Sequence, residues 1–335
     1  MKAVVLAETG GPEKLKVEEV PTPSPGAGMV RVKLRAAALN RRDYWMTVGL
    51  YPNMNLPVIP GSDGAGIVDA VGPGADGGLI GSEVVIYPAK NWGDNPATFG
   101  PDFRILGMPD QGTFAEYICV PVADIYPKPA HLNWEEAAAV PLAGLTAWRA
   151  VVTQAEARPG QTALITGAGS GVSTFAIQWA VQHGAEVWVS SGSPEKIERA
   201  KSLGAKGGAN YNDADCYAQL VKLTGGFDFA IDSAGGDAFN DILDALKPGG
   251  RYVFFGATRG VPSKATDLRR LFFRHIRIQG TTMGTPAEFR AMLDFVSKKR
   301  IRPVIDRVLP LEKAVEAHKL LESFSQTGKV VLRIV

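Results

Sequence analysis

The clearest chemical signal in the sequence is a glycine-rich turn between an apolar strand and a helix. The segment ALITGAGSGVSTFAIQWA (163–180) carries small residues at Gly167, Ala168, Gly169 and Gly171. A turn of this kind leaves backbone N–H groups at a helix N-terminus, where they bind phosphate. The spacing departs from a strict G-x-G-x-x-G because Val172 stands at the last glycine position. The segment predicts a dinucleotide site, and a tight turn without a ligand is the competing interpretation.

The end of the next strand indicates which dinucleotide this is. An NAD site usually has an acidic residue about 20 residues after the turn, where it binds the ribose 2′-hydroxyl. Here the strand ends in Ser190, Ser191, Gly192 and Ser193, and the first acid, Glu195, is already in a helix. Hydroxyls with Lys196 and Arg199 nearby suit a 2′-phosphate, so we predict NADPH. The alternative is that both cations are solvated helix residues.

Two parts of the chain differ in their residue patterns, and these patterns predict the elements that position this turn. Residues 1 to about 130 contain short alternating strands separated by Gly and Pro, which predicts an antiparallel, partly barrel-like β domain. Residues 130–283 alternate apolar strands with amphipathic helices, which predicts a doubly wound parallel sheet. The last strand, KVVLRIV (329–335), has no partner nearby in sequence, so we expect it to return to the β domain. The predicted domains are therefore 1–129 with 284–335, the catalytic domain, and 130–283, the NADP-binding domain.

Two details refine these boundaries. Asn133 and Glu136 have the spacing of a capping box, and Pro141 should kink or divide the helix that follows. The segment 90–112 has no clear periodicity and is expected to be a long loop.

Composition excludes several classes of function. The 335 residues carry a net charge of +2 and no dominant basic cluster, which argues against nucleic-acid binding. The two cysteines, Cys119 and Cys216, lie far apart, so a reducing cytoplasm is expected. The N-terminus lacks the features of a signal peptide, and no stretch approaches the length of a membrane span.

Several motifs taken together resemble the medium-chain dehydrogenase/reductase superfamily, and within it the zinc-free quinone oxidoreductase branch. The resemblance covers essentially the whole chain and rests on LNRRDYWMTVGLYP (39–52), GSDGAGIVDAVGPG (61–74), AAAVPLAGLTAW (137–148), the turn at 168–172, KPGGRYVFFGAT and GKVVLRI. It implies an α/β protein with a discontinuous GroES-like, partly open β-barrel domain and a Rossmann domain. Asp63 stands where the G-x-E-x-x-G-x-V signature of the superfamily has Glu, and Ser173 where the turn usually has Gly.

The resemblance also locates where zinc-dependent relatives hold their metal. The matching positions here are Asn40, Ser62 and Leu142, which cannot supply the three ligands of a catalytic zinc. The segment 90–112 has none of the cysteines that hold the structural zinc of those relatives. None of the four histidines, His131, His183, His275 and His318, has partners at ligand spacing. We therefore expect no bound metal.

The resemblance implies a set of cofactor contacts. These are Thr146 beside the nicotinamide, the turn residues, the residues around the 2′-phosphate, two strand ends that pass the nicotinamide, and a basic residue near the phosphates. In order they are Thr146, Ala168, Gly169, Gly171, Val172, Ser191, Lys196, Tyr211, Gly256, Thr258, Thr282, Met283 and Lys329. Tyr211 has an alternative role as a packing aromatic.

Without a Lewis acid, hydride addition to an activated acceptor is easier than alcohol oxidation. We therefore predict NADPH-dependent reduction of a quinone or an α,β-unsaturated carbonyl. Asn40 and Tyr51 are candidate hydrogen-bond donors, and Trp45 is a candidate flat wall. The full candidate pocket is Asn40, Trp45, Tyr51 and Ser62, with Asp43, Asp63 and Tyr87 as weaker members and Asp43 as a possible structural residue.

Two other functions remain open from sequence alone. One is an alcohol dehydrogenase or carbonyl reductase of the same fold, and the other is an NADPH-binding sensor without turnover. The strand RHIRIQG (274–280) looks like the edge of the dinucleotide sheet, which predicts a homodimer, with a tetramer as the alternative.

Overall fold

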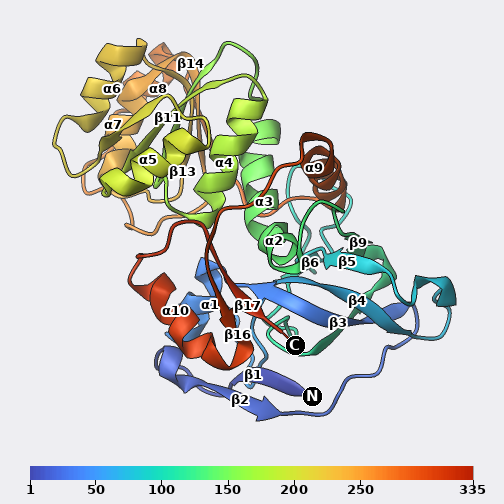
Figure 1. The fold of residues 1–335 in the computed structure, drawn as a ribbon. Coiled ribbons are helices and arrows are strands. Elements are labelled where there is room, and N and C mark those ends of the chain that lie inside the picture. The colour runs from blue at the N-terminus through green and yellow to red at the C-terminus, as the bar shows by residue number, and fades with distance from the viewer. Residues whose placement is uncertain (335) are drawn as a thin grey trace. The chain divides into compact units, whose positions relative to one another are not determined.

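The structure is a computed structural model, and it describes residues 1–334 of the chain. The chain folds into two compact units (Figure 1). The β unit consists of Met1–Ala143 with Thr285–Val335, and the α/β unit consists of Gly144–Gly284. The first unit is therefore discontinuous in sequence.

The β unit is built on a seven-stranded sheet in the order β16-β17-β3-β4-β5-β9, with β8 also paired to β3. Its strands are β3 (Met29–Ala38), β4 (Asp63–Val71), β5 (Glu83–Ile86), β8 (Tyr117–Pro121), β9 (Ile125–Pro127), β16 (Ile305–Pro310) and β17 (Lys329–Arg333). All pairs are antiparallel except β16–β17. In β3 every second residue from Val30 to Leu34 is buried, so one face of the strand lies on the core.

The C-terminal strand returns to this sheet, as expected. β17 lies beside β3 (Figure 1) and pairs with it antiparallel. In this pairing Val331 is opposite Ala38. Because of this pairing, Lys329 at the start of β17 lies close to residues of the N-terminal part of the chain.

Shorter elements complete the β unit. They are β1 (Lys2–Leu6), β2 (Leu15–Glu19), β6 (Ala89–Lys90), β7 (Arg104–Ile105), α1 (Arg41–Thr47), α2 (Trp134–Ala139), α9 (Pro286–Lys299), α10 (Ala314–Glu322), and short 3-10 turns at Pro12–Lys14, Gly77–Leu79, Val122–Asp124 and Leu311–Lys313. The segment 90–112, expected as a loop, begins at the two-residue strand β6 and contains its antiparallel partner β7, after which residues 106–112 follow.

The boundary between the units lies later than the expected 129/130. Helix α2 contacts β3, β4 and β17, so it belongs with the β unit. Asn133 and Glu136 form the predicted capping box, with Glu136 N–H donating to Asn133 Oδ1 at 2.8 Å. Pro141 begins a new helix, α3 (Pro141–Trp148), so the predicted division of the helix is confirmed. A π-helical turn, Arg149–Gln154, follows.

The α/β unit has a six-stranded parallel sheet in the order β12-β11-β10-β13-β14-β15. Its strands are β10 (Thr162–Thr166), β11 (Glu186–Ser191), β12 (Gly207–Asn210), β13 (Phe227–Asp232), β14 (Leu246–Phe254) and β15 (Arg277–Gly280), and its helices are α4 (Gly171–Gln182), α5 (Pro194–Ser202), α6 (Cys216–Thr224), α7 (Ala238–Ala245) and α8 (Leu268–Phe273). This is the order 3-2-1-4-5-6 of a dinucleotide-binding sheet. The strand order reverses between β10 and β13, so ligands are expected beyond the carboxyl end of β10.

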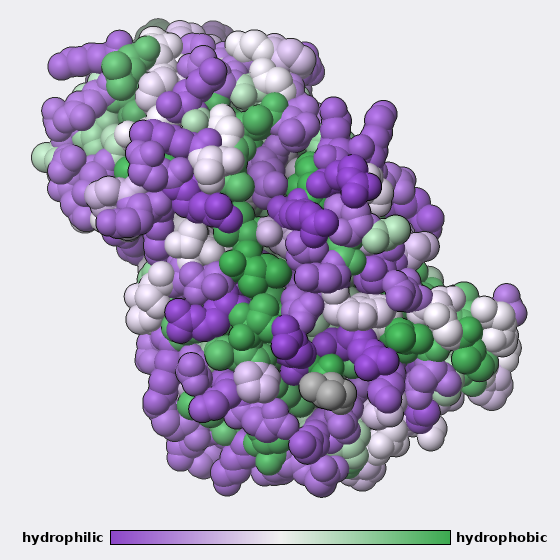
Figure 2. Space-filling model, viewed as in Figure 1, coloured by the Kyte–Doolittle hydropathy of each residue, from purple (hydrophilic) through white to green (hydrophobic). Residues whose placement is uncertain are grey.

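The helices and one face of the surface can be examined for apolar character. Among residues 1–334 no helix is both long and apolar enough to cross a bilayer. The face drawn in Figure 2 is mostly hydrophilic. An exception on this face is the turn between β4 and β5, where hydrophobic side chains gather (Figure 2). Ile80 of this turn is 54% exposed.

Candidate active site

The glycine turn after β10 has the backbone of an anion site. Gly167 has φ +61, a left-handed conformation that glycine adopts without strain. Ser170 caps α4, because its Oγ accepts a hydrogen bond from Ser173 N at 3.0 Å. Within the described chain no hydrogen bond uses the amides of Gly169, Gly171 or Val172. Three N–H groups are therefore available at the positive end of the helix dipole.

Ser173 takes part in closing this turn. Its hydroxyl donates to Thr166 O at 2.8 Å and accepts from Ser170 Oγ at 2.8 Å. Ser173 is 1% exposed, so its hydroxyl ties the start of α4 to the end of β10 and faces no ligand. The departure from glycine at this position thus leaves the three free amides unchanged.

The end of β11 brings together the residues expected around a 2′-phosphate. A Cβ on Gly169 would lie 2.4 Å from Lys196 Cδ, so the Lys196 side chain crosses the turn. A Cβ on Gly192 would lie 2.8 Å from Tyr211 Oη, so the tyrosine lies against the end of β11. Ser191, at that end, is 3% exposed. The first acid after β11 in the chain, Glu195, accepts from Ser193 Oγ at 2.5 Å in the first turn of α5.

Besides Lys196 and Arg199, which is exposed on α5, this region has a further cation that sequence analysis missed. The guanidinium carbon of Arg259 lies 4.3 Å from the centroid of the Tyr211 ring, a cation–π contact. Arg259 is exposed and follows β14 by five residues. In the sequence, the one sign of such a role is that Arg259 stands between Gly256 and Gly260, in the segment that follows a strand. Arg259 and Lys196 make this end of the sheet basic.

The other expected cofactor residues lie at the ends of α/β-unit elements. Thr146 is 6% exposed on α3, while Gly256 and Thr258 follow β14, and Thr282 and Met283 follow β15. Asp232, which sequence analysis also missed, organises the neighbouring loop. Its carboxylate accepts from Tyr252 Oη at 2.6 Å, from Gly235 N at 2.8 Å and from Thr166 Oγ1.

In the β unit, three expected site residues form one buried cluster. Lys329 Nζ donates to Asn40 Oδ1 at 2.7 Å and to Asp63 Oδ2 at 2.9 Å, and Asn40 Nδ2 donates to the same Asp63 oxygen at 2.9 Å. Asp63 Oδ1 accepts from Leu142 N at 2.7 Å. Asn40, Asp63 and Lys329 are 7%, 0% and 3% exposed. The ammonium of Lys329 is thus engaged inside the β unit, which favours a different role from the expected phosphate contact.

This cluster does not fit a zinc ion. The positions that hold ligands in zinc relatives carry Asn40, Ser62 and Leu142, and the amide of Asn40 already bonds Lys329 and Asp63. A buried ammonium there would repel a divalent cation, and an amide, a hydroxyl and a leucine are poor zinc ligands. Residues 1–334 contain no group of three His, Cys, Asp or Glu side chains arranged to hold a metal.

Asp43 supports the start of α1, the structural role that the sequence left open for it. Its Oδ2 accepts from Asn40 N at 2.7 Å, whereas Oδ1 has no hydrogen-bond partner. Burial raises the pKa of the Asp43 carboxyl to about 6, although Arg42 and Lys329 oppose the shift. The native protein therefore holds this proton to a higher pH than the unfolded chain, and the stability contributed by this group falls as the pH rises from about 4 to about 6.

Asp43→Asn is expected to remove this dependence. A shift of about two pKa units corresponds to roughly 3 kcal/mol, so the free energy of unfolding of the variant relative to wild type should rise by up to that amount between about pH 4 and pH 7. Urea denaturation across this range measures it. Asp94→Asn, at an exposed carboxyl, is the control. Parallel pH profiles for wild type and Asp43→Asn would contradict the assignment.

A second cluster joins Tyr51 and Ser62 through Arg42, a residue that sequence analysis missed. Arg42 Nε donates to Tyr51 Oη at 3.1 Å, and Arg42 Nη1 donates to Ser62 Oγ at 2.6 Å. The Ser62 hydroxyl donates to Leu106 O at 2.8 Å, so its single proton is already used. Ser62 thus holds Arg42 rather than offering a proton to a ligand.

The two remaining pocket candidates differ in exposure. Trp45 is partly exposed, and its ring centroid lies 5.3 Å from that of Tyr44. Tyr87 is 1% exposed and packs edge-on against Phe289, so it belongs to the core.

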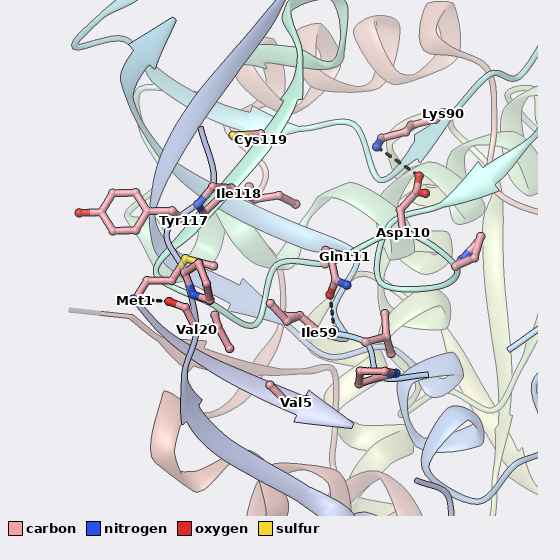
Figure 3. A pocket seen from close by; sticks show the side chains of 16 residues that line it. Met1, Val5, Val20, Ile59, Lys90, Asp110, Gln111, Tyr117, Ile118 and Cys119 are labelled. Atoms are coloured by element: carbon pink, nitrogen blue, oxygen red, sulfur yellow. Dashed lines mark hydrogen bonds and ion pairs between the residues drawn. The ribbon is translucent and has the colours of Figure 1, made fainter. Parts of the chain in front are cut away.

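A separate pocket of about 650 Å³ lies elsewhere in the β unit, and none of the expected site residues lines it (Figure 3). Lys90 and Asp110 form an ion pair of 3.2 Å at one side of it, and Gln111 Oε1 accepts from Ile59 N at 2.7 Å. Its other walls are mostly apolar. It contributes no reactive group to either cluster.

Comparison with known proteins shows the family to which the chain belongs. Residues 26–130 match the family model for the alcohol dehydrogenase GroES-like domain, and residues 171–298 match the model for zinc-binding dehydrogenases. The chain is 36% identical to the zinc-type alcohol dehydrogenase-like protein YogA of Leptosphaeria maculans, over 96% of this chain and 94% of that protein. The chain belongs to the medium-chain dehydrogenase/reductase superfamily.

Further members of the superfamily are similar over their whole length. The quinone oxidoreductase of Pseudomonas aeruginosa is 32% identical, with 99% of each chain covered. The crystal structure of an NAD-dependent alcohol dehydrogenase is 42% identical, with a TM-score of 0.95 and 100% of each chain covered. The chain is therefore an oxidoreductase of this superfamily, with a GroES-like domain and a Rossmann domain, as the sequence motifs predicted.

Proposed function

We propose that this superfamily member is an NADPH-dependent, zinc-independent reductase of a quinone or an α,β-unsaturated carbonyl. The observation that carries the proposal is the Lys329 ammonium, bonded to Asn40 and Asp63 where zinc relatives hold their metal. With a fixed cation and no zinc ligands there, the favoured acceptor is one that delocalises negative charge by itself.

Residues of the Rossmann domain would hold the cofactor. The free amides of Gly169, Gly171 and Val172 suit the pyrophosphate, and Ser191, Lys196, Tyr211 and Arg259 suit the 2′-phosphate. When bound, the nicotinamide supplies the hydride. The absence of an acidic side chain at the end of β11 supports NADPH over NADH.

Residues of the GroES-like domain would meet the acceptor. Trp45 and Tyr51 are the partly exposed members of the candidate pocket, and Tyr51 retains a phenolic proton that it can donate to an oxyanion. Asn40 is held by Lys329 and Asp63, so only one of its amide hydrogens remains for an acceptor oxygen. Ser62 and Asp43 position these groups.

Protein dialysed against a chelator should oxidise NADPH with 1,4-benzoquinone or trans-2-hexenal, followed at 340 nm, at the rate of undialysed protein. Tyr51→Phe should lower kcat by about tenfold or more, since one proton donor is worth roughly that factor or more. Leu50→Ala, at the exposed neighbouring residue, is the control. Alcohol oxidation that requires added zinc would overturn the proposal, and tight NADPH binding without turnover of any acceptor would favour a sensor.

NAD-dependent alcohol oxidation is a second candidate because a 42% identical solved protein is described as an NAD-dependent alcohol dehydrogenase. This candidate predicts that simple alcohols reduce NAD⁺ in an assay that follows absorbance at 340 nm.

The environment expected for either activity is a reducing, cytoplasmic one, which the free thiols of Cys119 and Cys216 support.

We also propose a homodimer through the edge of the Rossmann sheet. β15 is the edge strand and its four residues are all exposed. Large apolar side chains are exposed on β15 and on elements next to it in the sheet or the chain, namely Ile278 of β15, Phe254 of β14, and Leu268, Phe272 and Phe273 of α8. An unpaired edge with adjacent apolar surface favours antiparallel pairing of two copies.

Ile278→Lys combined with Phe272→Glu should convert the dimer to a monomer of 35.7 kDa, measured by light scattering after size exclusion. The two charges would be buried without partners in the dimer, at a cost of several kcal/mol. Leu223→Glu, at a more exposed apolar residue of α6, should leave the dimer intact. A wild-type monomer at micromolar concentration would contradict the proposal.

A further inference from the structure

Arg42 is a buried cation that has no carboxylate in direct contact with its guanidinium. It is 8% exposed, and no Asp or Glu oxygen of residues 1–334 lies within 4.0 Å of its guanidinium nitrogens. Its N–H groups donate instead to neutral oxygens, namely Tyr51 Oη, Ser62 Oγ, Leu106 O and Met108 O. A buried arginine normally has a carboxylate in direct contact, whereas the charge of Arg42 is opposed at longer range by the carboxyl of Asp43. The direct bonds of Arg42 to neutral oxygens therefore call for another explanation.

Three of these acceptors fix the orientation of the guanidinium. Nη1 donates to Ser62 Oγ at 2.6 Å and to Leu106 O at 2.7 Å, and Nη2 donates to Met108 O at 3.3 Å. The acceptors belong to two separate segments, residue 62 and the loop 106–108. Because the guanidinium is planar and rigid, these bonds also fix the direction in which Nε points.

Nε points at Tyr51. It donates to Tyr51 Oη at 3.1 Å, and the guanidinium carbon lies 4.6 Å from the ring centroid. This bond occupies a lone pair of the phenol oxygen, and the described chain offers the Tyr51 proton no acceptor. Tyr51 is only half-buried, so the proton is directed to a group outside the protein.

We propose that Arg42 is the positioning residue that holds Tyr51 as a proton donor to the acceptor oxygen. This inference rests on the proposed function. As a hydride adds to carbon, the electron pair of the acceptor double bond moves to its oxygen, and the Tyr51 O–H breaks to give that oxygen a proton. The adjacent guanidinium compensates the phenolate until a proton from water restores it. One hydride and one proton are transferred in total.

A purely structural role for Arg42 predicts different behaviour. Arg42 also joins α1 to the loop 106–108, and its loss would disturb both. A structural loss would add to the loss caused by Tyr51→Phe, because the two changes would act independently. If Arg42 acts through Tyr51, removal of both should cost no more than the larger single loss.

The test uses 4-nitrophenolate, a flat oxyanion whose absorbance reports binding without turnover. Arg42→Gln and Tyr51→Phe should each weaken its binding about tenfold, and the double variant should also lose about tenfold rather than a hundredfold. Arg42→Lys, which keeps the charge but cannot bridge four acceptors, should recover only part of the loss. Arg104→Gln, at an exposed arginine of the same loop region, is the control.

The kinetic readout is the solvent deuterium isotope effect on acceptor reduction, which Tyr51→Phe should abolish and Arg42→Gln should reduce. NADPH affinity should stay within about twofold, because neither residue belongs to the proposed cofactor site. A hundredfold loss in the double variant, or a wild-type protein that does not bind the probe, would overturn the inference. Probe binding with the expected coupling but no turnover would overturn the proposed function alone. Ser62→Ala, which removes one Nη1 contact, supplies the same comparison if Arg42→Gln does not fold.

Discussion

Lys329→Met is expected to destabilise the protein by about 3–5 kcal/mol, because it breaks a buried ion pair and leaves one charge behind. Lys329 is 3% exposed and its ammonium bonds Asn40 Oδ1 and Asp63 Oδ2. Its removal leaves the Asp63 carboxylate, which is 0% exposed, without its counter-charge. Urea denaturation followed by tryptophan fluorescence measures the loss.

A second variant separates the charge from the packing. Lys329→Met combined with Asp63→Asn removes both charges, and the side-chain amides of Asn40 and the new asparagine can then bond each other. We expect the double variant to be more stable than Lys329→Met by about 2 kcal/mol. Lys16→Met, at an exposed lysine of β2, should change stability by less than about 0.5 kcal/mol. A Lys329→Met protein as stable as wild type would show that the ion pair contributes nothing.

The sequence could not predict this cluster, although it predicted its members. Asn40, Asp63 and Lys329 were each singled out, but Lys329 is 289 residues from Asn40 and was expected at the cofactor. The position of β17 beside β3 was predictable because an apolar C-terminal strand needs a partner. Which side chains the pairing would bring together depends on register, and register is set by tertiary packing.

The Rossmann sheet was the easiest part to predict, since strand and helix periods alternate there without interruption. All of its strands, from β10 to β15, lie within residues 130–283, for which the sequence predicted this alternation. Arg42 was missed for the opposite reason. Two of its acceptors are backbone carbonyls of the segment 106–108, which has no periodicity, so no residue type in the sequence marks them. Likewise the Ser62 hydroxyl was expected to meet substrate, but it is occupied by the same segment.

The glycine turn illustrates how far local pattern carries a functional prediction. Strand, turn and helix followed from residue type alone, and so did the amides they leave free. Arg259 did not, because its contact with Tyr211 joins the loop after β14 to the end of β12. The proposed preference for NADPH rests on Arg259 as well as on Lys196. The experiment that tests this preference therefore changes both residues.

Lys196→Ala combined with Arg259→Ala is expected to weaken NADPH binding about a hundredfold and leave NADH binding within about twofold. Each cation would give the 2′-phosphate a charge-assisted hydrogen bond, and each such bond to a charged group is worth roughly 1.5–3 kcal/mol, or about tenfold or more in affinity. NADH has no 2′-phosphate, so the same changes remove nothing that it uses. Quenching of intrinsic fluorescence, titrated with each cofactor at two salt concentrations, measures both constants.

The control lies on the same helix. Lys201 is exposed on α5 and pairs with Glu198 at 2.6 Å, so Lys201→Ala removes one positive charge from α5 without touching the end of β11. It should leave both affinities unchanged, which excludes a general effect of net charge. Raised salt should weaken NADPH binding to wild type more than to the double variant. Salt screens the contacts of the two cations with the 2′-phosphate, and the double variant already lacks these contacts. Equal losses for NADPH and NADH would mean that Lys196 and Arg259 support the turn rather than the 2′-phosphate, and the preference for NADPH would then have to come from elsewhere in the site.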